Sequence, residues 1–440
     1  MSEQQGGGST RRDFIRSASA AAVATTVASS LDRLVGAYAA GSDEIRVGLV
    51  GCGGRGTGAA GNVVKAAPGV RIVALADAFR DRLDECRQTL AKEHADMATV
   101  ADDHCFVGLD AFQQLLKTDV NYVILATPPG FRPGHIKAAI DAGKNIFAEK
   151  PVAVDAAGVR ACLGMADEIT KRGVAMAAGT QYRHFDPYIQ AMKRIHEGSI
   201  GTVTAARAYY NTSELWKRDR KPEWTELENQ MRNWLYYTWL SGDHIVEQFI
   251  HNIDAMNWGL QGHPIRAIGT GGRQVRTAPE YGHIYDHFAV VYEYDNGVFC
   301  TAMCRQQNGT DKKVANEFTG TKGSALVLPN YVINGSNPWK YEGEPNDMYV
   351  QEHTDLIASI RAGKPLNELK QVAESTMSAI MGREAAYTGQ ELTWDEVLKA
   401  DLDLMPPKVE FGPLDVPPVP MPGVTRLNRK WNEGGKPVKA

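Results

Sequence analysis

The feature that most constrains this chain is a glycine-rich loop between a short apolar run and a helix-like segment. The loop, residues 51–56 with the sequence GCGGRG, directly follows the apolar residues 45–50. Its spacing is G-x-G-x-x-G, in which glycines allow a tight turn and bring a pyrophosphate close to the first amides of a helix. The loop residues expected to hold a dinucleotide are Gly51, Gly53, Gly54, Arg55 and Gly56.

A second apolar run ends at an acid in the position that such a nucleotide site requires. Residues 70–76 are typical of a strand, and Asp77 follows them about 20 residues after the last glycine. A carboxylate there accepts hydrogen bonds from ribose hydroxyls and repels a 2′-phosphate. We therefore expect NAD as the cofactor in preference to NADP, although Arg80 lies close enough to weaken that preference.

The alternation of strand and helix continues through the first half of the chain. Residues 121–126 and 145–149 are expected strands, and residues 133–142 are an expected helix between them. This order predicts a Rossmann fold, a doubly wound parallel sheet whose ligands lie beyond the carboxyl ends of the strands. Thr127, Pro128 and Lys150 should therefore face the nicotinamide.

The second half has a different pattern. Consecutive strand-like runs without intervening helices predict an α+β domain with an open, mostly antiparallel sheet, and the turn at residues 295–297 (DNG) favours a hairpin. The runs are residues 202–212, 285–294, 298–305, 314–319 and 324–328. The whole chain is thus expected to be α/β, with a dinucleotide domain over 41–165, a substrate and oligomerisation domain over 166–400, and a proline-rich arm over 401–440. The arm is expected to pack on the body or on a neighbouring subunit.

A predicted helix over residues 243–258 carries the most informative polar stripe. Its apolar residues form one face, while Asp243, Glu247, His251 and Asp254 collect on another. Acids beside a histidine suit a proton relay, because a carboxylate can orient an imidazole. A solvated face with helix-supporting pairs is the alternative.

Composition excludes several classes of protein. The formal net charge is −4, whereas binding of nucleic acid requires a basic face. No apolar run reaches the ~20 residues of a membrane span. The 6 cysteines contain no C-x-x-C pair, so neither a zinc site nor any other metal site is expected. Cys300 and Cys304 share a strand face and are expected to pack there rather than to form a disulfide.

The N-terminus has the pattern of an export signal. Arg11 and Arg12 precede Phe14, an alanine-rich stretch follows, and Ala37 and Ala39 form a small-residue cleavage site. Twin arginines resemble the twin-arginine (Tat) signal, so residues 1–40 are expected to direct a folded protein to the periplasm or another extracytoplasmic space. An exposed amphipathic helix is the alternative.

Together these motifs resemble the Gfo/Idh/MocA family, which includes glucose–fructose oxidoreductase and inositol dehydrogenase. The matching segments are residues 51–56, 126–128 (ATP), 142–145 (AGKN), 149–151 (EKP), 179–183 (GTQYR), 197–201 (EGSIG) and 250–254 (IHNID). The resemblance implies that Lys150 and His251 are catalytic and that Glu247 replaces the usual aspartate beside the histidine. It adds His135, Glu149 and Gln181 to Thr127, Pro128 and Lys150 as cofactor contacts. Arg183 and Asp254 are expected to bind substrate together with Lys150 and His251.

Two positions are left open by the resemblance. Arg132 stands where a histidine is frequent, and it is expected either to meet an anionic or hydroxyl-rich substrate or to be exposed at the helix start. The Trp-rich segment, residues 215–240, is expected to form either a pocket wall or ordinary core and subunit contacts.

The resulting expectation is an exported NAD-dependent oxidoreductase that acts on a sugar, a sugar derivative or a cyclitol. A redox-assisted glycoside hydrolase with tightly bound NAD is the first alternative, and a non-enzymatic NAD(H)-responsive binding protein is the second. The resemblance also implies a homodimer or homotetramer.

Overall fold

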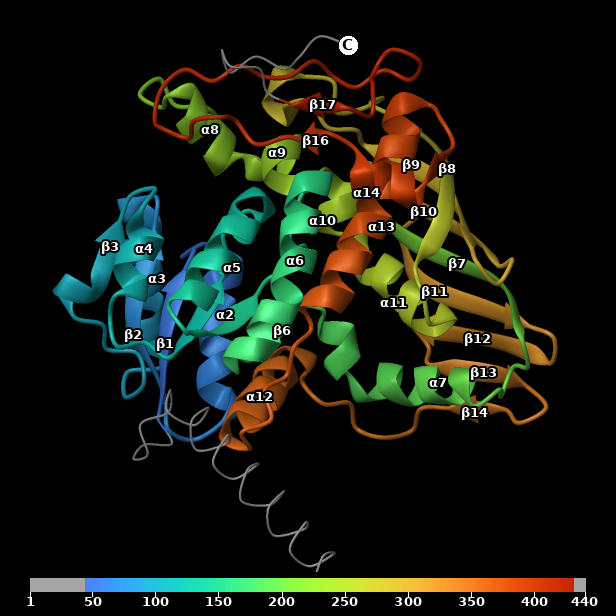
Figure 1. The fold of residues 1–440 in the computed structure, drawn as a ribbon, viewed down its shortest axis with the longest axis horizontal. Helices are drawn as coiled ribbons and strands as arrows, with labels where there is room; N and C mark the ends of the chain where they lie inside the picture. The colour runs from blue at the N-terminus through green and yellow to red at the C-terminus, as the bar shows by residue number, and fades with distance from the viewer. Residues whose placement is uncertain (1–43, 431–440) are drawn as a thin grey trace, which may run out of the picture. The chain divides into compact units, whose positions relative to one another are not determined.

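The structure is a computed structural model that describes residues 44–430. The predicted export signal lies outside the described residues. Residues 44–430 belong to one compact unit that contains two sheets (Figure 1).

The first sheet has six parallel strands in the order β3-β2-β1-β4-β5-β6, which confirms the predicted Rossmann fold. Its strands are β1 (Ile45–Val50), β2 (Val70–Asp77), β3 (Cys105–Val107), β4 (Tyr122–Leu125), β5 (Asn145–Ala148) and β6 (Met176–Ala178). The helices in this part of the chain are α2 (Gly54–Ala66), α3 (Arg80–Glu93), α4 (Ala111–Leu116), α5 (Arg132–Asp141) and α6 (Ala156–Arg172). Strand β6 lies beyond residue 165, where the sequence places the domain boundary.

Alternation along β1 explains why helices cover both faces of this sheet. Val47 and Leu49 share one buried cluster with Val63 of α2, whereas Val50 belongs to the cluster that contains Ile136 of α5. Side chains of successive strand residues point to opposite faces, so β1 contributes to two cores. Its carboxyl end leads directly into the glycine loop.

The second sheet has nine strands in the order β14-β13-β12-β11-β7-β10-β9-β8-β15. They are β7 (Val203–Thr212), β8 (Pro264–Gly272), β9 (His287–Tyr294), β10 (Phe299–Gln306), β11 (Lys313–Gly320), β12 (Gly323–Leu328), β13 (Val332–Gly335), β14 (Trp339–Lys340) and β15 (Leu392–Thr393). Strands β7 and β10 are parallel and the other neighbours are antiparallel, which confirms a mostly antiparallel sheet. Gly297 has φ +76° in the predicted hairpin turn.

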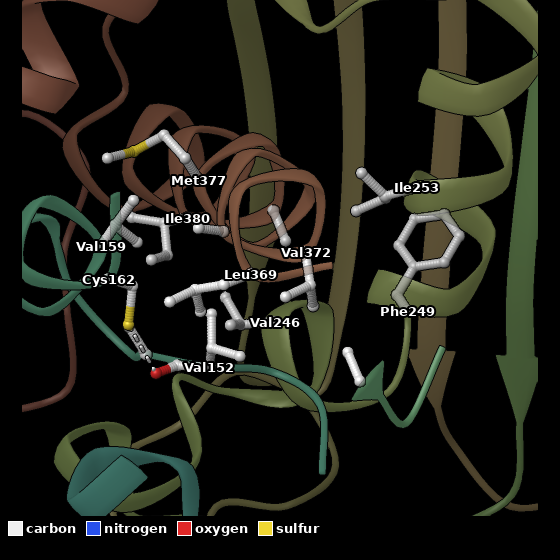
Figure 2. Close-up of a cluster of buried hydrophobic side chains, with 14 of the residues drawn as sticks. Val152, Val159, Cys162, Val246, Phe249, Ile253, Leu369, Val372, Met377 and Ile380 are labelled. Carbon is white, nitrogen blue, oxygen red and sulfur yellow. Dashed lines mark hydrogen bonds between the residues drawn. The ribbon is translucent and has the colours of Figure 1, made fainter. Parts of the chain in front are cut away.

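Helices of the second half pack behind this sheet and against the first domain. They are α7 (Asp186–His196), α8 (Glu226–Arg232), α9 (Thr238–Ser241), α10 (His244–Glu247), α11 (Ile250–Leu260), α12 (Met348–Arg361), α13 (Leu369–Thr388) and α14 (Trp394–Lys399). Helix α13 contacts α6, α11 and β8. Val246, Phe249 and Ile253 share a buried cluster with Leu369 and Val372 of α13 (Figure 2). This packing fixes the segment that carries His251.

The predicted helix over 243–258 is two helices, α10 and α11. Phe249 N donates to His244 O, five residues back, which widens the turn between them. Asp243 has φ +71° and precedes α10. Its carboxylate accepts hydrogen bonds from Tyr285 N at 2.8 Å and from the Tyr387 hydroxyl at 2.5 Å. The prediction that Asp243 belongs to the polar stripe is therefore wrong, because its side chain turns into the core.

The cysteines of residues 44–430 form no disulfide, and the C-terminal arm packs on its own chain. All 6 cysteines are free, and Cys300 and Cys304 are buried on β10, as expected from packing. The described part of the arm packs on the body of its own chain: the Tyr285 hydroxyl donates to Pro420 O at 2.9 Å, and Arg429 pairs with the buried Glu384. Two short parallel strands, β16 (Leu402–Asp403) and β17 (Arg429–Lys430), pair the beginning of the arm with the end of its described part.

Candidate active site

The glycine loop forms one wall of a cavity of about 590 Å³. Gly51 has φ +99°, and a Cβ there would lie 2.8 Å from Thr127 N. A Cβ on Gly56 would lie 1.8 Å from Gly51 O. Both positions therefore require glycine, one for its backbone conformation and both for the close approach of β1, α2 and β4.

The residues between these glycines leave room for a pyrophosphate. A Cβ on Gly53 or Gly54 would meet nothing within 4 Å, so the loop is open at these two positions. Gly53 is the N-cap of α2 and offers no side chain to its first amides. Free amides at a helix N-terminus bind phosphate oxygens. The loop therefore fits a dinucleotide.

Asp77 lines the same cavity at the end of β2. Its Oδ2 accepts from Cys52 N at 2.7 Å and its Oδ1 from Phe79 N at 2.8 Å. Burial raises the pKa of this carboxyl, and the two amide hydrogen bonds oppose that effect. Arg82 also lines the cavity, whereas Arg80 faces Asp84 at 3.7 Å. Asp77 is thus held where a ribose would meet it.

Thr127, Pro128 and His135 line the cavity beyond β4. Thr127 Oγ1 and His135 Nδ1 are 3.1 Å apart. Burial, reinforced by the charge of Arg132, lowers the pKa of His135 to about 3, so its imidazole is neutral. The ring of His135 stacks on Phe131 with centroids 6.0 Å apart. This face of the cavity is uncharged.

Arg132 is neither exposed nor directed at a substrate site. It is buried at 1% exposure and donates to the backbone carbonyls of Thr127, Glu149 and Pro151, the last at 2.7 Å. The guanidinium therefore ties together the segments that follow β4 and β5. Both predictions for Arg132 from the sequence are wrong, because the side chain is buried and its two Nη groups donate to backbone carbonyls.

Lys150 and Glu247 form a nearly buried pair. Lys150 Nζ lies 2.9 Å from Glu247 Oε1 and also donates to the Glu247 backbone carbonyl. Glu247 was expected to orient the imidazole of His251. The structure instead pairs its carboxylate with the ammonium of Lys150, which lies just beyond the end of β5.

His251 lies on the first turn of α11. Its pKa is well below the ordinary value because of burial, with smaller contributions from the charges of Lys150 and Arg55. Its Nδ1 is buried and has no hydrogen-bond partner among the described residues. The ring of Tyr182 is 5.5 Å from that of His251. The imidazole is therefore neutral.

Arg183 and Asp254 contact each other directly. Arg183 Nε and Nη2 donate to the two Asp254 oxygens at 2.8 and 3.0 Å. Ser375 Oγ donates to Asp254 Oδ1 at 2.7 Å, and Gln371 donates to the same oxygen. This network joins the segment after β6 to α11 and α13. The expected substrate contacts of Arg183 and Asp254 stay predictions.

A buried acid that no sequence motif indicates, Glu352, reaches Arg55 of the glycine loop. Arg55 pairs with Glu149 and, at 3.1 Å, with Glu352 of α12, while its guanidinium lies 5.0 Å from the ring centre of Tyr349. Burial, followed by the charge of Glu149, raises the pKa of Glu352. Gln181 hydrogen-bonds to Tyr349. The only sequence signal for Glu352 is an acid at an apolar position of a helix.

The Trp-rich segment has both of the roles expected of it, as a pocket wall and as core packing. Trp216 and Trp234 line the cavity opposite the glycine loop, whereas Trp239 is fully packed in a small core with Leu227 and Tyr236. The segment is thus a pocket wall that has its own core.

Residues 44–430 contain neither a metal-binding cluster nor a membrane-spanning helix. No group of three or more His, Cys, Asp and Glu side chains there could hold a metal ion. Within the same residues, every helix is too short or too polar to span a bilayer.

Two family models match the chain. "Oxidoreductase family, NAD-binding Rossmann fold" matches residues 45–179, and "GFO/IDH/MocA C-terminal domain" matches residues 188–326. The chain is 24% identical over 287 residues to scyllo-inositol 2-dehydrogenase (NAD(+)) of Bacillus subtilis, covering 64% of this chain and 74% of that protein. It is 24% identical over 361 residues to inositol 2-dehydrogenase 3 of Saccharopolyspora erythraea, covering 79% and 94%.

A solved structure has the same fold. Scyllo-inositol dehydrogenase from Lactobacillus casei, with bound NAD(H) and scyllo-inositol, superposes with a TM-score of 0.61 at 18% identity. The match covers 80% of this chain and 99% of that one. Matched by one family's models in both halves, the chain belongs to the Gfo/Idh/MocA family of oxidoreductases and has its NAD-binding Rossmann domain.

Proposed function

We propose that this oxidoreductase transfers a hydride between the CH–OH group of a sugar, sugar derivative or cyclitol and the nicotinamide of NAD. The observation that carries the proposal is the Lys150–Glu247 pair beside the neutral His251, at the end of a strand that leads from the NAD-binding sheet. The inositol dehydrogenases among its relatives support this substrate class.

Each side chain has a distinct part in the reaction. Bound NAD supplies the hydride acceptor. Lys150 hydrogen-bonds the reacting oxygen and stabilises its developing negative charge, which is strongest as a preorganised contact in a partly buried site. His251 takes the hydroxyl proton while the carbon loses its hydride, so the alcohol becomes a carbonyl. Glu247 is a positioning residue that holds the Lys150 ammonium.

Polar groups around His251 would bind the remaining hydroxyls. Gln181 and Arg183 come from the segment that follows β6, and Asp254 is one turn beyond His251 on α11. Tyr210 adds a hydroxyl whose pKa is raised to about 12 by burial and by the charge of Glu247, so it stays a neutral donor. Neutral and charged donors together suit a polyhydroxyl substrate.

Assembly and location belong to the same proposal. The open sheet leaves Ile268 of β8 and Phe299 of β10 more than half exposed, at 52% and 54%. A homodimer or homotetramer would cover such apolar side chains. The twin arginines Arg11 and Arg12 support export of the folded protein to the periplasm or another extracytoplasmic space.

The test is turnover by variants that keep the cofactor. Lys150→Ala and His251→Ala should still bind NAD but oxidise inositols and aldoses at least about a hundredfold more slowly. Lys137→Ala is the matched control, because this lysine forms only an exposed pair with Asp141. Unchanged turnover in both active-site variants would overturn the proposal.

A further inference from the structure

We propose that the Trp-rich segment is the second half of the cofactor site, and that it retains NAD between turnovers by enclosing the adenosine end. The inference rests on the NAD assignment and on no particular substrate. The segment lies outside the dinucleotide-binding domain in sequence, yet it contributes a wall to that domain's cavity.

The Trp-rich segment lies at the end of the cavity where Asp77 would bind a ribose. Asp77, where a ribose would bind, lines the cavity together with Trp216, Arg218 and Trp234. The guanidinium of Arg218 lies 5.3 Å from the ring centre of Trp216. Aromatic and guanidinium planes stack on nucleobases without requiring a particular base. An adenine beyond the ribose would therefore lie against this segment.

The Trp-rich segment is attached to the first domain through Arg232. Arg232 of α8 donates to both oxygens of Asp81 on α3, at 2.9 and 3.0 Å. The same guanidinium lies 4.0 Å from the ring centre of Phe79, and its Nε donates to Glu228 Oε1 at 2.8 Å. Two parallel hydrogen bonds and a stacked ring fix the geometry of the contact. Arg232 also lines the cavity, so these bonds lie at the cavity wall.

The C-terminal arm also contacts the Trp-rich segment. Leu227 N donates to Gly412 O at 3.2 Å, and Gln230 Nε2 reaches Asp415 O at 3.5 Å. The ring of Phe411 lies 5.9 Å from that of Phe79. The arm therefore bridges the Trp-rich segment and the first domain near Asp77.

Retention follows from these contacts. A cofactor bound along the glycine loop would have Asp77 on one side and the Trp-rich segment on the other. Its release would require the Arg232–Asp81 bonds to open or the segment to move from the arm. Such barriers act on the dissociation rate more than on association.

The experiment measures release of NADH from the full-length protein. Wild type loaded with NADH and passed through a desalting column should keep the cofactor, and chase with excess NAD should displace it slowly. Arg232→Ala and Asp81→Asn should each release NADH at least about tenfold faster. The second variant changes a largely exposed carboxylate, so it tests the contact without removing a packed side chain.

Arg220→Ala is the matched control, because Arg220 pairs with Glu226 within the same segment and does not reach the first domain. It should release NADH at the wild-type rate. Thermal unfolding of every variant shows whether the fold is intact. The inference is overturned if wild type loses NADH on the column, or if the folded Asp81→Asn variant releases it at the wild-type rate. Because no substrate is used, these results are independent of the proposed hydride transfer.

Discussion

Lys150 Nζ lies 2.9 Å from Glu247 Oε1, and the same ammonium donates to the Glu247 backbone carbonyl. The pair joins the end of a parallel strand to a helix of the second domain, across a sequence separation of 97. It therefore positions a cation at the carboxyl edge of the NAD-binding sheet, where the proposed reaction places the substrate hydroxyl.

Glu247→Gln should lower kcat about 10- to 100-fold, because a hydrogen bond to a charged group contributes about 1.5–3 kcal/mol. The affinity for NAD should not change, since Glu247 does not line the cofactor cavity. Steady-state kinetics and NADH binding measure the two quantities. The kcat of Glu247→Asp should lie between those of the wild type and Glu247→Gln. A wild-type kcat for the Gln variant would contradict a positioning role for this acid.

Asp77→Ala should shift cofactor preference toward NADP by at least about tenfold, because it removes a charge that repels the 2′-phosphate. Arg82 and Arg218 line the same cavity and would meet that phosphate. The measurement is the ratio of kcat/KM for NADP and NAD. Asp84→Ala, on the outer side of α3, is the control and should leave the ratio unchanged. An unchanged ratio in Asp77→Ala would show that another group sets the preference.

Arg429→Ala should destabilise the protein by about 3 kcal/mol, because it leaves the buried Glu384 short of a partner. Arg429 donates to both oxygens of this carboxylate, and Glu384 is fully buried. The neighbouring Lys430→Ala breaks only an exposed pair with Asp401 and should cost less than about 1 kcal/mol. Urea unfolding compares the two. Equal free energies of unfolding would mean that the arm is not anchored through Glu384.

His184 should make the protein less stable as the pH rises above neutral. Burial alone would lower its pKa, but the carboxylates of Asp355 and Glu368, 2.7 and 3.3 Å from its ring nitrogens, outweigh burial and raise it to about 10. Between an unfolded pKa of about 6.5 and this value, the native state holds a proton that the unfolded state has lost. Stability from this group is complete below about pH 6.5 and falls by about 1.4 kcal/mol per pH unit above it.

The check is urea unfolding across that range for wild type and His184→Asn. The variant should be less stable at pH 6.5 and should lose less stability on going to pH 9 than wild type does. His196→Asn, which changes an exposed histidine, should keep the wild-type slope. Parallel slopes for wild type and His184→Asn would contradict the raised pKa.

Local signals allowed much of the fold to be predicted, and long-range packing explains what was missed. The glycine loop, Asp77 and the strands around residues 295–297 have short-range patterns that fix their structure. Arg55 and Glu352 are separated by 297 residues, and no period or motif connects them. Helix α12 packs on the first domain although it follows all but the last strand of the second sheet in sequence, with Leu356 and Ile357 in the core of the Rossmann domain.

The candidate site shows the same division. Motif matching pointed to Lys150 and His251, but the partner of Glu247 depended on where α10 ends relative to β5. Arg132 was misjudged because its sequence position, at a helix start, says nothing about the carbonyls that gather around it. The break between α10 and α11 arises from a backbone turn that a helical pattern does not reveal.

The most direct test of the central claim is transfer of deuterium from substrate to cofactor. The full-length protein is loaded with NAD and given inositols and aldoses that are deuterated at one CH–OH carbon at a time. The cofactor released by denaturation is then analysed by mass spectrometry. Hydride transfer predicts that wild type forms NADH carrying one deuterium from a single substrate position, and that Lys150→Ala forms it at least about a hundredfold more slowly. Absence of deuterium from the cofactor with every polyhydroxyl substrate would contradict the account.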